Sequence, residues 1–405
     1  MVNAVPTRDA VEFRWRVAFF GAIAWFVCQR RVHVDWTNLG DGPAGRIAEL
    51  ALASDVADYV RFRAVCRPWR RCSPDPRAGA GLDGRFLPRQ WIMLDKALTG
   101  ARRYPFLNIS TGECIWVDIP ELPEHILLAV TPEGLLLLLH EPTLVVHLLN
   151  PLTGKLTGFP PLTSLLTSEQ QLSRRCGDRI GERFTVTGAG LVVHRSMLAI
   201  TSVHPMLLAV AEPSCESWTV VEDGFITSTA TFGGQFYCTN DSGVMMLDTT
   251  GSDQQPPRLR VVVDRSRALI FFNAMEHGLH LMDNGGELML VHRIAFLNMN
   301  DMSFKRKYGV SRVDLNAGIL IPVKSFNGRA VFMGMRGAVS ISAETFPSVT
   351  ADTLYMSIGW DAKREMDRYI SFHSDYRVVA FGLDALRSVN FGCLEFQSKR
   401  VQGCS

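Results

Sequence analysis

From Leu82 onward, the chain alternates short apolar runs with turn residues. The runs hold roughly four to eight aliphatic, β-branched or aromatic residues, and Gly, Asn, Asp and Pro separate them. Such runs predict β-strands, and the clearest are residues 114–117, 144–149, 260–263, 288–291 and 377–381. Short helices are expected near residues 161–171 and 361–368. No strand leads through a glycine-rich turn into a helix, so a nucleotide-binding α/β fold is not expected.

A pattern of two glycines, eight or nine residues apart, recurs along this region. Its clear copies begin at Gly234, Gly278 and Gly328, and less clean copies begin at Gly134 and Gly190. The mean spacing is about 48.5 residues, and a strand-rich repeat near 50 residues is typical of a β-propeller. In that fold, four-stranded sheets stack around an axis because a single twisted sheet cannot cover both of its faces. Residues 85–396 then hold six or seven blades; a pair of β-sandwiches is the alternative.

Ahead of the strands, residues 34–76 show a helical pattern. Apolar residues recur three and four positions apart, with arginines between them, at Val56, Tyr59, Val60, Phe62, Val65, Cys66 and Trp69. This predicts a small helical module with an apolar stripe and a basic back. Such a stripe must be buried, and the module is too small to form a stable core alone. It therefore packs on the rest of the chain or binds a partner.

Residues 34–76 resemble the F-box, the helical motif that docks a protein onto the adaptor subunit of SCF-type ubiquitin ligases. We call the matching positions the seam residues: Leu39, Ile47, Leu50, Val56, Val60, Phe62, Val65, Cys66 and Trp69. The resemblance implies that they contact the adaptor. The second half of the motif is the specific part. The first half departs from it, with Gly40 in place of proline and residues 43–45, Pro-Ala-Gly, in place of leucines.

Residues 85–396 resemble the KIB-type β-propeller, which follows the F-box in a large group of plant proteins. The matching stretches are residues 105–113, 149–154, 313–315, 323–332 and 346–355. Together, the two resemblances imply the target-recognition subunit of an SCF-type ubiquitin ligase, in which the propeller binds a target protein. The alternative is a non-catalytic propeller that has lost the adaptor contact and acts by binding a partner.

Composition narrows these possibilities. The 405 residues carry a net charge of +2 and 47% hydrophobic residues, which fits one large and one small globular domain without the charge of a nucleic-acid-binding protein. The first 80 residues hold 12 arginines against 8 acidic residues, which we interpret as solvated helix faces. The nine cysteines are scattered, with no Cys-x-x-Cys pair. They indicate a reducing compartment, the cytoplasm or nucleus, without a disulfide framework or zinc site.

Residues 1–33 are expected to be an N-terminal extension, and residues 397–405 a C-terminal tail. Within the extension, residues 17–28 form an apolar block of 12 residues, shorter than the roughly 20 that a membrane helix needs. We interpret the block as a helix that packs on the body or as part of an extension outside the ordered domain. Contact with a membrane surface and a cleaved signal are the alternatives.

Motifs of catalysis are absent from the sequence. It has no nucleophile elbow, phosphate-binding loop, dinucleotide fingerprint or His-Glu-x-x-His pair. His277 and His280 are three positions apart on a predicted strand and so face opposite sides, which does not suit a shared metal. His140 and His147 flank a hairpin and are expected to pack across strands. Residues 283–287 are expected to form a turn. We therefore expect no enzymatic activity, cofactor or metal.

Overall fold

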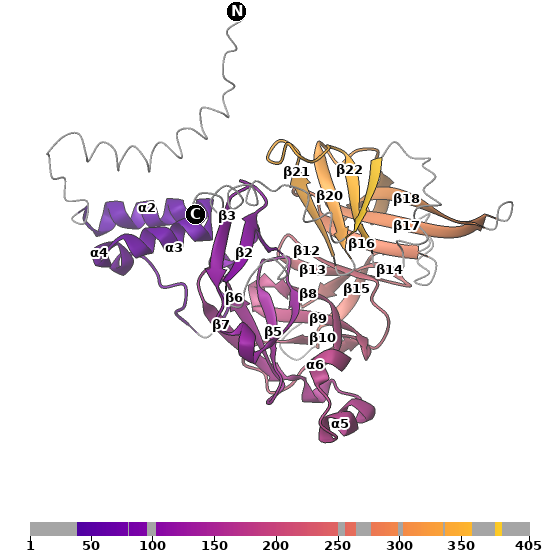
Figure 1. Cartoon of the computed structure of the whole chain (residues 1–405), viewed down its shortest axis with the longest axis horizontal. Coiled ribbons are helices and arrows are strands. Elements are labelled where there is room, and N and C mark those ends of the chain that lie inside the picture. The colour runs from indigo at the N-terminus through magenta and orange to yellow at the C-terminus, as the bar shows by residue number, and fades with distance from the viewer. Residues whose placement is uncertain are drawn as a thin grey trace, which may run out of the picture. The chain divides into compact units, whose positions relative to one another are not determined.

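The computed structural model describes residues 39–79, 81–94, 103–249, 256–264, 277–298, 303–334, 337–358 and 377–382. Contacts divide the chain into two units, residues 1–75 and residues 76–405. The described part of the first unit is helical, and the second consists mainly of strands (Figure 1). The extension at residues 1–33, the expected helix at residues 361–368 and the tail at residues 397–405 lie outside the described residues.

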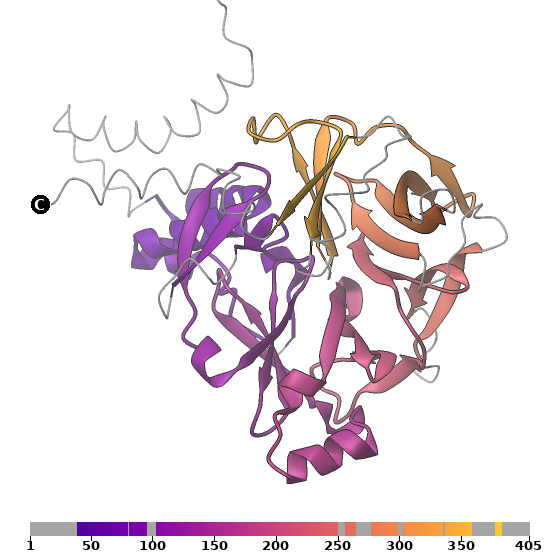
Figure 2. The same ribbon diagram turned by 45° about the vertical axis from the view of Figure 1, so that its right-hand side comes forward.

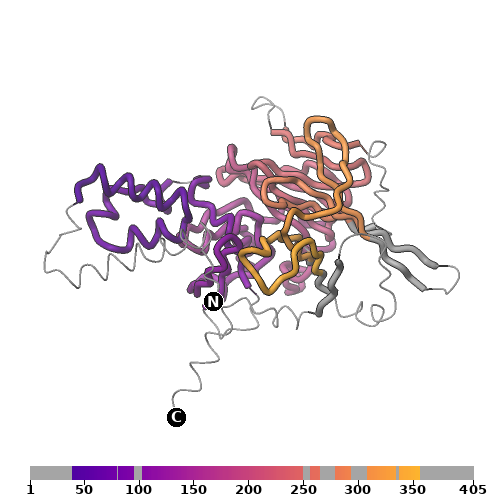
Figure 3. The backbone as a smooth tube through the Cα atoms, turned by 90° about the horizontal axis from the view of Figure 1, so that it is seen from above, coloured from indigo at the N-terminus to yellow at the C-terminus, as the bar shows by residue number. Residues whose placement is uncertain are grey.

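The described part of the first unit contains three helices that pack on one another (Figures 1 and 3): α2 (Asp41–Ser54), α3 (Val56–Val65) and α4 (Arg67–Arg71). Its buried apolar side chains are Ala44, Ala48, Val56, Ala57, Tyr59 and Phe62. The two buried residues of α2 are alanines. Most of the apolar volume in this small core therefore comes from α3.

Helix α2 forms despite the glycines and proline near its start. Pro43 lies in the first turn, where a backbone N–H has no partner within the helix, so the missing donor costs little. Asp55 then ends α2 and begins α3. Its backbone is extended, and its side chain accepts a hydrogen bond from the N–H of Ala57 at 2.7 Å, which caps α3.

The helical pattern of residues 56–69 is split between two helices. Cys66 lies between α3 and α4 in an extended conformation, with φ −156° and ψ 168°. Pro68 explains the break, because in a continuous helix its ring would clash with the carbonyl of Ala64. The predicted stripe therefore bends at Cys66.

The second unit is a ring of six sheets among the described residues (Figure 2). The first sheet has β1 (Trp91–Met93), β2 (Arg103–Asn108) and β3 (Cys114–Asp118). The second has β4 (Ile126–Val130), β5 (Leu136–His140), β6 (Val145–Asn150) and β7 (Lys155–Pro161). The third has β8 (Thr185–Val192), β9 (Met197–His204), β10 (Met206–Ala211) and β11 (Thr219–Glu222).

The remaining sheets have four strands each. The fourth has β12 (Ser228–Phe232), β13 (Gln235–Asn240), β14 (Gly243–Asp248) and β15 (Arg258–Asp264). The fifth has β16 (His277–Asp283), β17 (Leu288–Asn298), β18 (Ser303–Asp314) and β19 (Ile319–Pro322). The sixth has β20 (Arg329–Gly334), β21 (Gly337–Ser342), β22 (Thr353–Ile358) and β23 (Arg377–Gly382). Sheets two to five are antiparallel meanders, whereas β22 pairs in parallel with both β20 and β23.

One short helix, η2 (Gly84–Phe86), precedes the strands, and others connect them: η4 (Leu122–Glu124), η5 (Leu162–Ser164), α5 (Ser168–Arg175), α6 (Ile180–Arg183) and η6 (Val193–Arg195). η5 and α5 lie where the sequence predicts a helix, near residues 161–171. Thr167 and Gln170 cap α5 reciprocally, each side chain bonding the other's backbone N–H. The strands predicted at residues 114–117, 144–149, 260–263 and 377–381 are present within a residue or two, whereas the strand predicted at residues 288–291 continues to Asn298.

Apolar clusters between neighbouring sheets hold the ring together. Clusters lie between sheets two and three, three and four, four and five, and five and six. Another joins the sixth sheet to the first, where Phe346, Ile341 and Tyr355 pack with Leu107. Because the last sheet packs on the first, the ring closes. The chain is a six-bladed β-propeller preceded by a small helical module.

The turns between strands reuse one design. In three of them an Asn or Asp side chain accepts hydrogen bonds from the backbone two and three residues ahead, and a glycine four residues ahead donates to its carbonyl. The pairs are Asn108 with Gly112, Asn150 with Gly154 and Asp314 with Gly318. These glycines have φ values of 74°, 67° and 66°, a left-handed conformation that glycine adopts at little cost.

The glycine repeat marks real hairpins, β13–β14, β16–β17 and β20–β21, but not equivalent places in the blades. Gly234 precedes the second strand of its sheet, whereas Gly278 lies within the first strand of the next sheet. Residues 283–287, expected to be a turn, do connect β16 and β17, and the Asp283 carboxylate accepts from the N–H of Gly286 at 2.7 Å.

Candidate functional site

The helical module divides the seam residues by exposure. Val56 and Phe62 are buried within it. Leu39, Val60, Cys66 and Trp69 are half-buried. Ile47, Leu50 and Val65 are exposed, with 39%, 59% and 62% of their surface accessible. The nine residues therefore do not form one continuous exposed strip: part of the set makes the module's own core, and part lies on its surface.

The buried part of the seam stabilises the module. The rings of Phe62 and Trp69 stack with their centroids 4.7 Å apart and an angle of 15° between their planes. Because α2 contributes only Ala44 and Ala48 to the core, larger side chains from α3 fill the space between the helices. Phe62 is thus a packing residue, and Trp69 covers it.

The exposed part of the seam leaves branched aliphatic side chains in solvent. Ile47 and Leu50 are three residues apart on α2 and are neighbours on its surface, while Val65 is the last residue of α3. Single exposed apolar residues are common on any protein. Here three such residues lie in a module of fewer than 40 described residues. A partner that covers them would gain about 25 cal/mol of binding free energy for every Å² of apolar surface buried.

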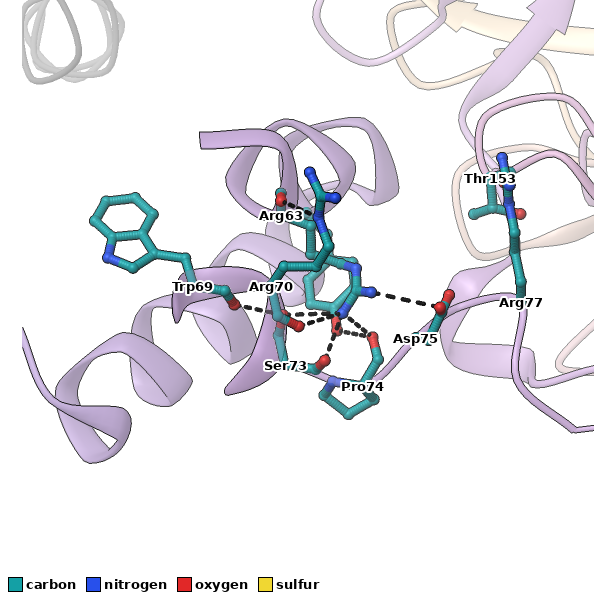
Figure 4. A network of polar contacts seen from close by, with 9 residues as sticks. Arg63, Trp69, Arg70, Ser73, Pro74, Asp75, Arg77 and Thr153 are labelled. Carbon is teal, nitrogen blue, oxygen red and sulfur yellow. Dashed lines mark hydrogen bonds and ion pairs between the residues drawn. The ribbon is translucent and has the colours of Figure 1, made fainter. Parts of the chain in front are cut away.

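One arginine ties the end of the module together (Figure 4). Nη1 of Arg63 donates to the carbonyls of Pro74 at 2.8 Å and of Arg70 at 3.1 Å, and it also donates to the carbonyl of Ser73. Nη2 forms an ion pair with Asp75 at 3.7 Å. The Arg63 side chain is 12% exposed. The basic back predicted from the sequence is therefore not uniform, because this arginine binds backbone carbonyls inside the module.

Further bonds fix the segment after α4. Ser73 Oγ donates to the carbonyl of Trp69 at 2.8 Å, and the Tyr59 hydroxyl donates to the carbonyl of Pro74 at 2.6 Å. The Trp69 indole points away from this network, to which the residue contributes only its carbonyl (Figure 4). The tryptophan ring is thus positioned by α4 and by the stacking with Phe62.

The Cys72 thiol of the module does not have the properties of a catalytic nucleophile. Burial, and then the charge of Asp41, raise the pKa of Cys72. The Cys72 Sγ also lies 3.2 Å from the carbonyl of Trp69. A thiol whose pKa is raised is a poor nucleophile, because the thiolate is the reactive form.

The propeller contains a group of three imidazoles of which the sequence indicated two. His125 precedes β4, His140 ends β5 and His147 lies in β6. The ring centroid of His125 is 5.3 Å from that of His140 and 5.1 Å from that of His147. The sequence pattern did not single out His125, although the pairing of Ile126 with Leu139 continues to His125 opposite His140.

Hydrogen bonds order this histidine group. Nδ1 of His125 lies 2.8 Å from the carbonyl of Glu121 and must donate to it, which leaves Nε2 to accept from Nδ1 of His147 at 3.2 Å. Burial, and then the charges of His125 and His140, lower the pKa of His147. The lowered pKa favours the neutral form of the His147 ring.

Within the described ranges, no group of three or more His, Cys, Asp and Glu side chains has the geometry to hold a metal ion. None of the helices in that part of the chain reaches the length and hydrophobicity of a membrane span. Of the two histidines at positions 277 and 280, only His280 has a side chain among those that the structure describes.

Comparison with known proteins adds to this geometry. The model of the KIB1-4 beta-propeller family matches residues 106–379, about two thirds of the chain. The chain belongs to the KIB1-4 beta-propeller family. The matched region begins in β2 and ends in β23, so it spans all six sheets of this KIB1-4 propeller. Among curated proteins, none matches the chain.

Several solved structures resemble parts of this KIB1-4 propeller. The allergen Mala s 1 of Malassezia sympodialis is 12% identical, with a TM-score of 0.31 over 58% of this chain and 87% of that one. YCF48 from Cyanidioschyzon merolae is 10% identical, with a TM-score of 0.31 over 60% and 77%. A streptogramin B lyase is 10% identical, with a TM-score of 0.28 over 55% and 76%. With TM-scores this low, nothing about the function of this chain is inferred from these structures.

Proposed function

We propose that the chain is the target-recognition subunit of an SCF-type ubiquitin ligase. Its helical module docks onto the ligase adaptor, and its propeller binds the protein to be modified. The chain performs no chemistry itself; it contributes by holding the target close to the transferring subunits. We further propose that it works in the cytoplasm or nucleus and needs neither metal nor cofactor.

The observation that carries this proposal is the exposure of Leu50 and Val65. Both occupy positions that match the F-box pattern, and more than half of each side chain is accessible. The arrangement of three short helices, with α3 and α4 divided at Cys66, supports the same interpretation. An adaptor surface that covers these residues would bury apolar area that the module leaves exposed.

The first test is binding of the purified full chain to a purified SCF adaptor subunit. Val65→Asp and Leu50→Asp place a charge where we expect an apolar contact, and we expect each to lower the affinity at least tenfold. Because neither side chain is buried in the module, both variants should keep their fold. A matched control is Val220→Asp, which alters an exposed valine of β11 in the propeller, 47% accessible, and should leave adaptor binding unchanged.

Trp69→Ala is a less specific test than the sequence implied. Its ring stacks on Phe62, so the substitution also disturbs the core of the module. Failure of the unmutated chain to bind the adaptor would contradict the ligase proposal directly, whatever the variants do.

One observation favours the second candidate function, a propeller that binds partners without an adaptor. Where the F-box pattern has leucines, α2 buries only Ala44 and Ala48. An adaptor surface that is complementary to leucines would bury less apolar area against these smaller side chains. If the chain retains partners in cells but does not bind the adaptor, this candidate replaces the first.

A further inference from the structure

Glu133 lies in a turn, yet its carboxyl is buried, whereas the side chains of turns are usually exposed. It lies between β4 and β5, and only 2% of its surface is accessible. The next residue, Gly134, has φ 80°, and a Cβ there would lie 2.3 Å from the carbonyl oxygen of Pro88. The turn is therefore packed against neighbouring backbone and cannot move Glu133 into solvent.

The Glu133 carboxyl reaches two further sheets. Its Oε1 accepts a hydrogen bond from the N–H of Leu191 in β8 at 3.2 Å. Strand β8 contacts both β4 and β12. On β12, Thr231 lies close enough to influence the carboxyl. The carboxyl thus lies where sheets two, three and four meet.

Two buried oxygen atoms at this point lack a hydrogen-bond partner among the described residues: Glu133 Oε2 and Thr231 Oγ1. A buried polar atom without a hydrogen-bond partner destabilises the folded protein. Thr231 Oγ1 lies against Gly190, the residue before Leu191, where no side chain intervenes.

The charge state decides which atom donates. Burial has the largest effect on Glu133 and raises its pKa, while the neighbouring Thr131, the Leu191 N–H and Thr231 act in the lowering direction, and none of these neighbours is a cation. An ionised carboxylate buried without a cation is costly by several kcal/mol, whereas a protonated one is neutral and carries an O–H donor.

We propose that Glu133 is a neutral carboxylic acid in the folded protein, and that its Oε2–H donates to Thr231 Oγ1 so that one side chain links sheets two, three and four. A single proton satisfies both unpartnered oxygens. Loss of this proton would place an uncompensated charge at the junction of three blades and loosen the ring. The propeller therefore contains a pH-sensitive link that opens as pH rises.

Unfolding of the full chain by denaturant, measured between pH 5 and pH 9, tests this link against Glu133→Gln. The variant keeps a donor at the same position but cannot ionise. Because the folded pKa is raised, the contribution of Glu133 is complete below its unfolded pKa of about 4.5 and declines as pH rises. We expect the unfolding constant of the wild type to rise tenfold per pH unit relative to the variant until the folded pKa is reached. Parallel curves would overturn the proposal.

A second readout identifies the protonated group itself. The infrared difference spectrum of wild type minus Glu133→Gln at pH 7 should contain the carbonyl band of a protonated carboxyl. Glu141→Gln is the matched control: Glu141 accepts from the N–H groups of Ile180 and Gly181, and its substitution should not remove that band. Absence of the band in the wild type would mean an ionised Glu133 and overturn the proposal.

Thr231→Val keeps the proposal testable if Glu133→Gln does not fold. If Thr231 accepts a hydrogen bond from protonated Glu133, removing the hydroxyl destabilises the protonated form. The pH at which the decline in stability ends should then be lower than in the wild type. Removing a donor to a carboxylate would instead raise it, which would contradict the proposal. Stabilisation of the wild type, but not of Glu133→Gln, by added K⁺ or Ca²⁺ would show a cation at the carboxylate and would equally contradict it.

Discussion

At the scale of single residues, the propeller holds three imidazoles close together in its second sheet. His147 is half-buried, bonds to His125 and has a second imidazole, His140, in the same group. Each ring that gains a proton adds a positive charge beside the others. Strands β4, β5 and β6 fix the three rings, so they cannot separate without disturbing the second sheet.

This arrangement predicts an acid-sensitive second sheet. The pKa of His147 is lowered, so its contribution to stability is present above the unfolded pKa of about 6.5 and is lost as pH falls below it. We expect the free energy of unfolding to decline less between pH 7 and pH 5 in His147→Gln than in the wild type, measured by denaturant titration.

The control for that titration is His194→Gln, which removes a histidine outside the group and should keep the wild-type decline. If His147→Gln declines as steeply as the wild type, the histidine group does not cause the acid sensitivity. The Glu133 link acts in the opposite direction of pH, so the two effects are separable in one set of curves.

At the scale of elements, two glycines illustrate why the same residue type has different roles. Gly45 lies inside α2, and a Cβ there would lie 3.6 Å from the carbonyl oxygen of Cys72, an ordinary contact. Gly134 has a positive φ and would place a Cβ in collision with the backbone of Pro88. The first glycine is a cost to its helix, and the second is a requirement of its turn.

We therefore predict opposite effects of alanine at these positions. Gly45→Ala should stabilise the helical module by up to about 1 kcal/mol, because alanine has the higher helix propensity. Gly134→Ala should destabilise the propeller by more than about 1 kcal/mol, because the left-handed backbone and the backbone contact both oppose a side chain. Hydrogen exchange resolved by segment measures each effect in its own unit. A loss of protection in the module of Gly45→Ala would show that the glycine is needed there.

The elements also show how far the sequence could lead. The apolar runs predicted the positions of the strands well, because a strand that is buried in a propeller consists largely of apolar residues and is bounded by turn residues. The turn before β6 was not foreseen: Leu144 adopts φ 59° at the position that Gly154 and Gly318 occupy in similar turns, and no propensity predicts a buried leucine there. The glycine period gave the right architecture even though its copies fall at different strands of the blades.

The candidate site was predictable only in part. Helical spacing identified Val56 and Phe62 as residues that must be buried, but spacing does not say by what. The structure shows that the module itself covers them. The buried residues of α2 are alanines, so the larger side chains of α3 fill the space between the helices. His125 and Glu133 were missed, since their partners come from strands that the sequence does not align: Glu133 meets Leu191, 58 residues away.

At the scale of the whole molecule, the six sheets close into a ring while the helices form a separate unit. The two differ greatly in the size of their cores. The buried residues of the propeller join into clusters between consecutive sheets, whereas the module depends on a few residues around Phe62. A chain segment this short has little apolar area to bury and is correspondingly marginal.

The last prediction follows from this difference. Removing a buried phenylalanine ring costs about 3–5 kcal/mol, which is close to or above the stability expected of so small a module. Phe62→Ala should therefore abolish hydrogen-exchange protection in residues 39–75 and leave the strands protected. Phe236→Ala, in the cluster between sheets three and four, should weaken the strands and leave the module unchanged. If each variant instead lowered protection in both units together, the chain would be a single cooperative unit, and adaptor docking could not be assigned to the helices alone.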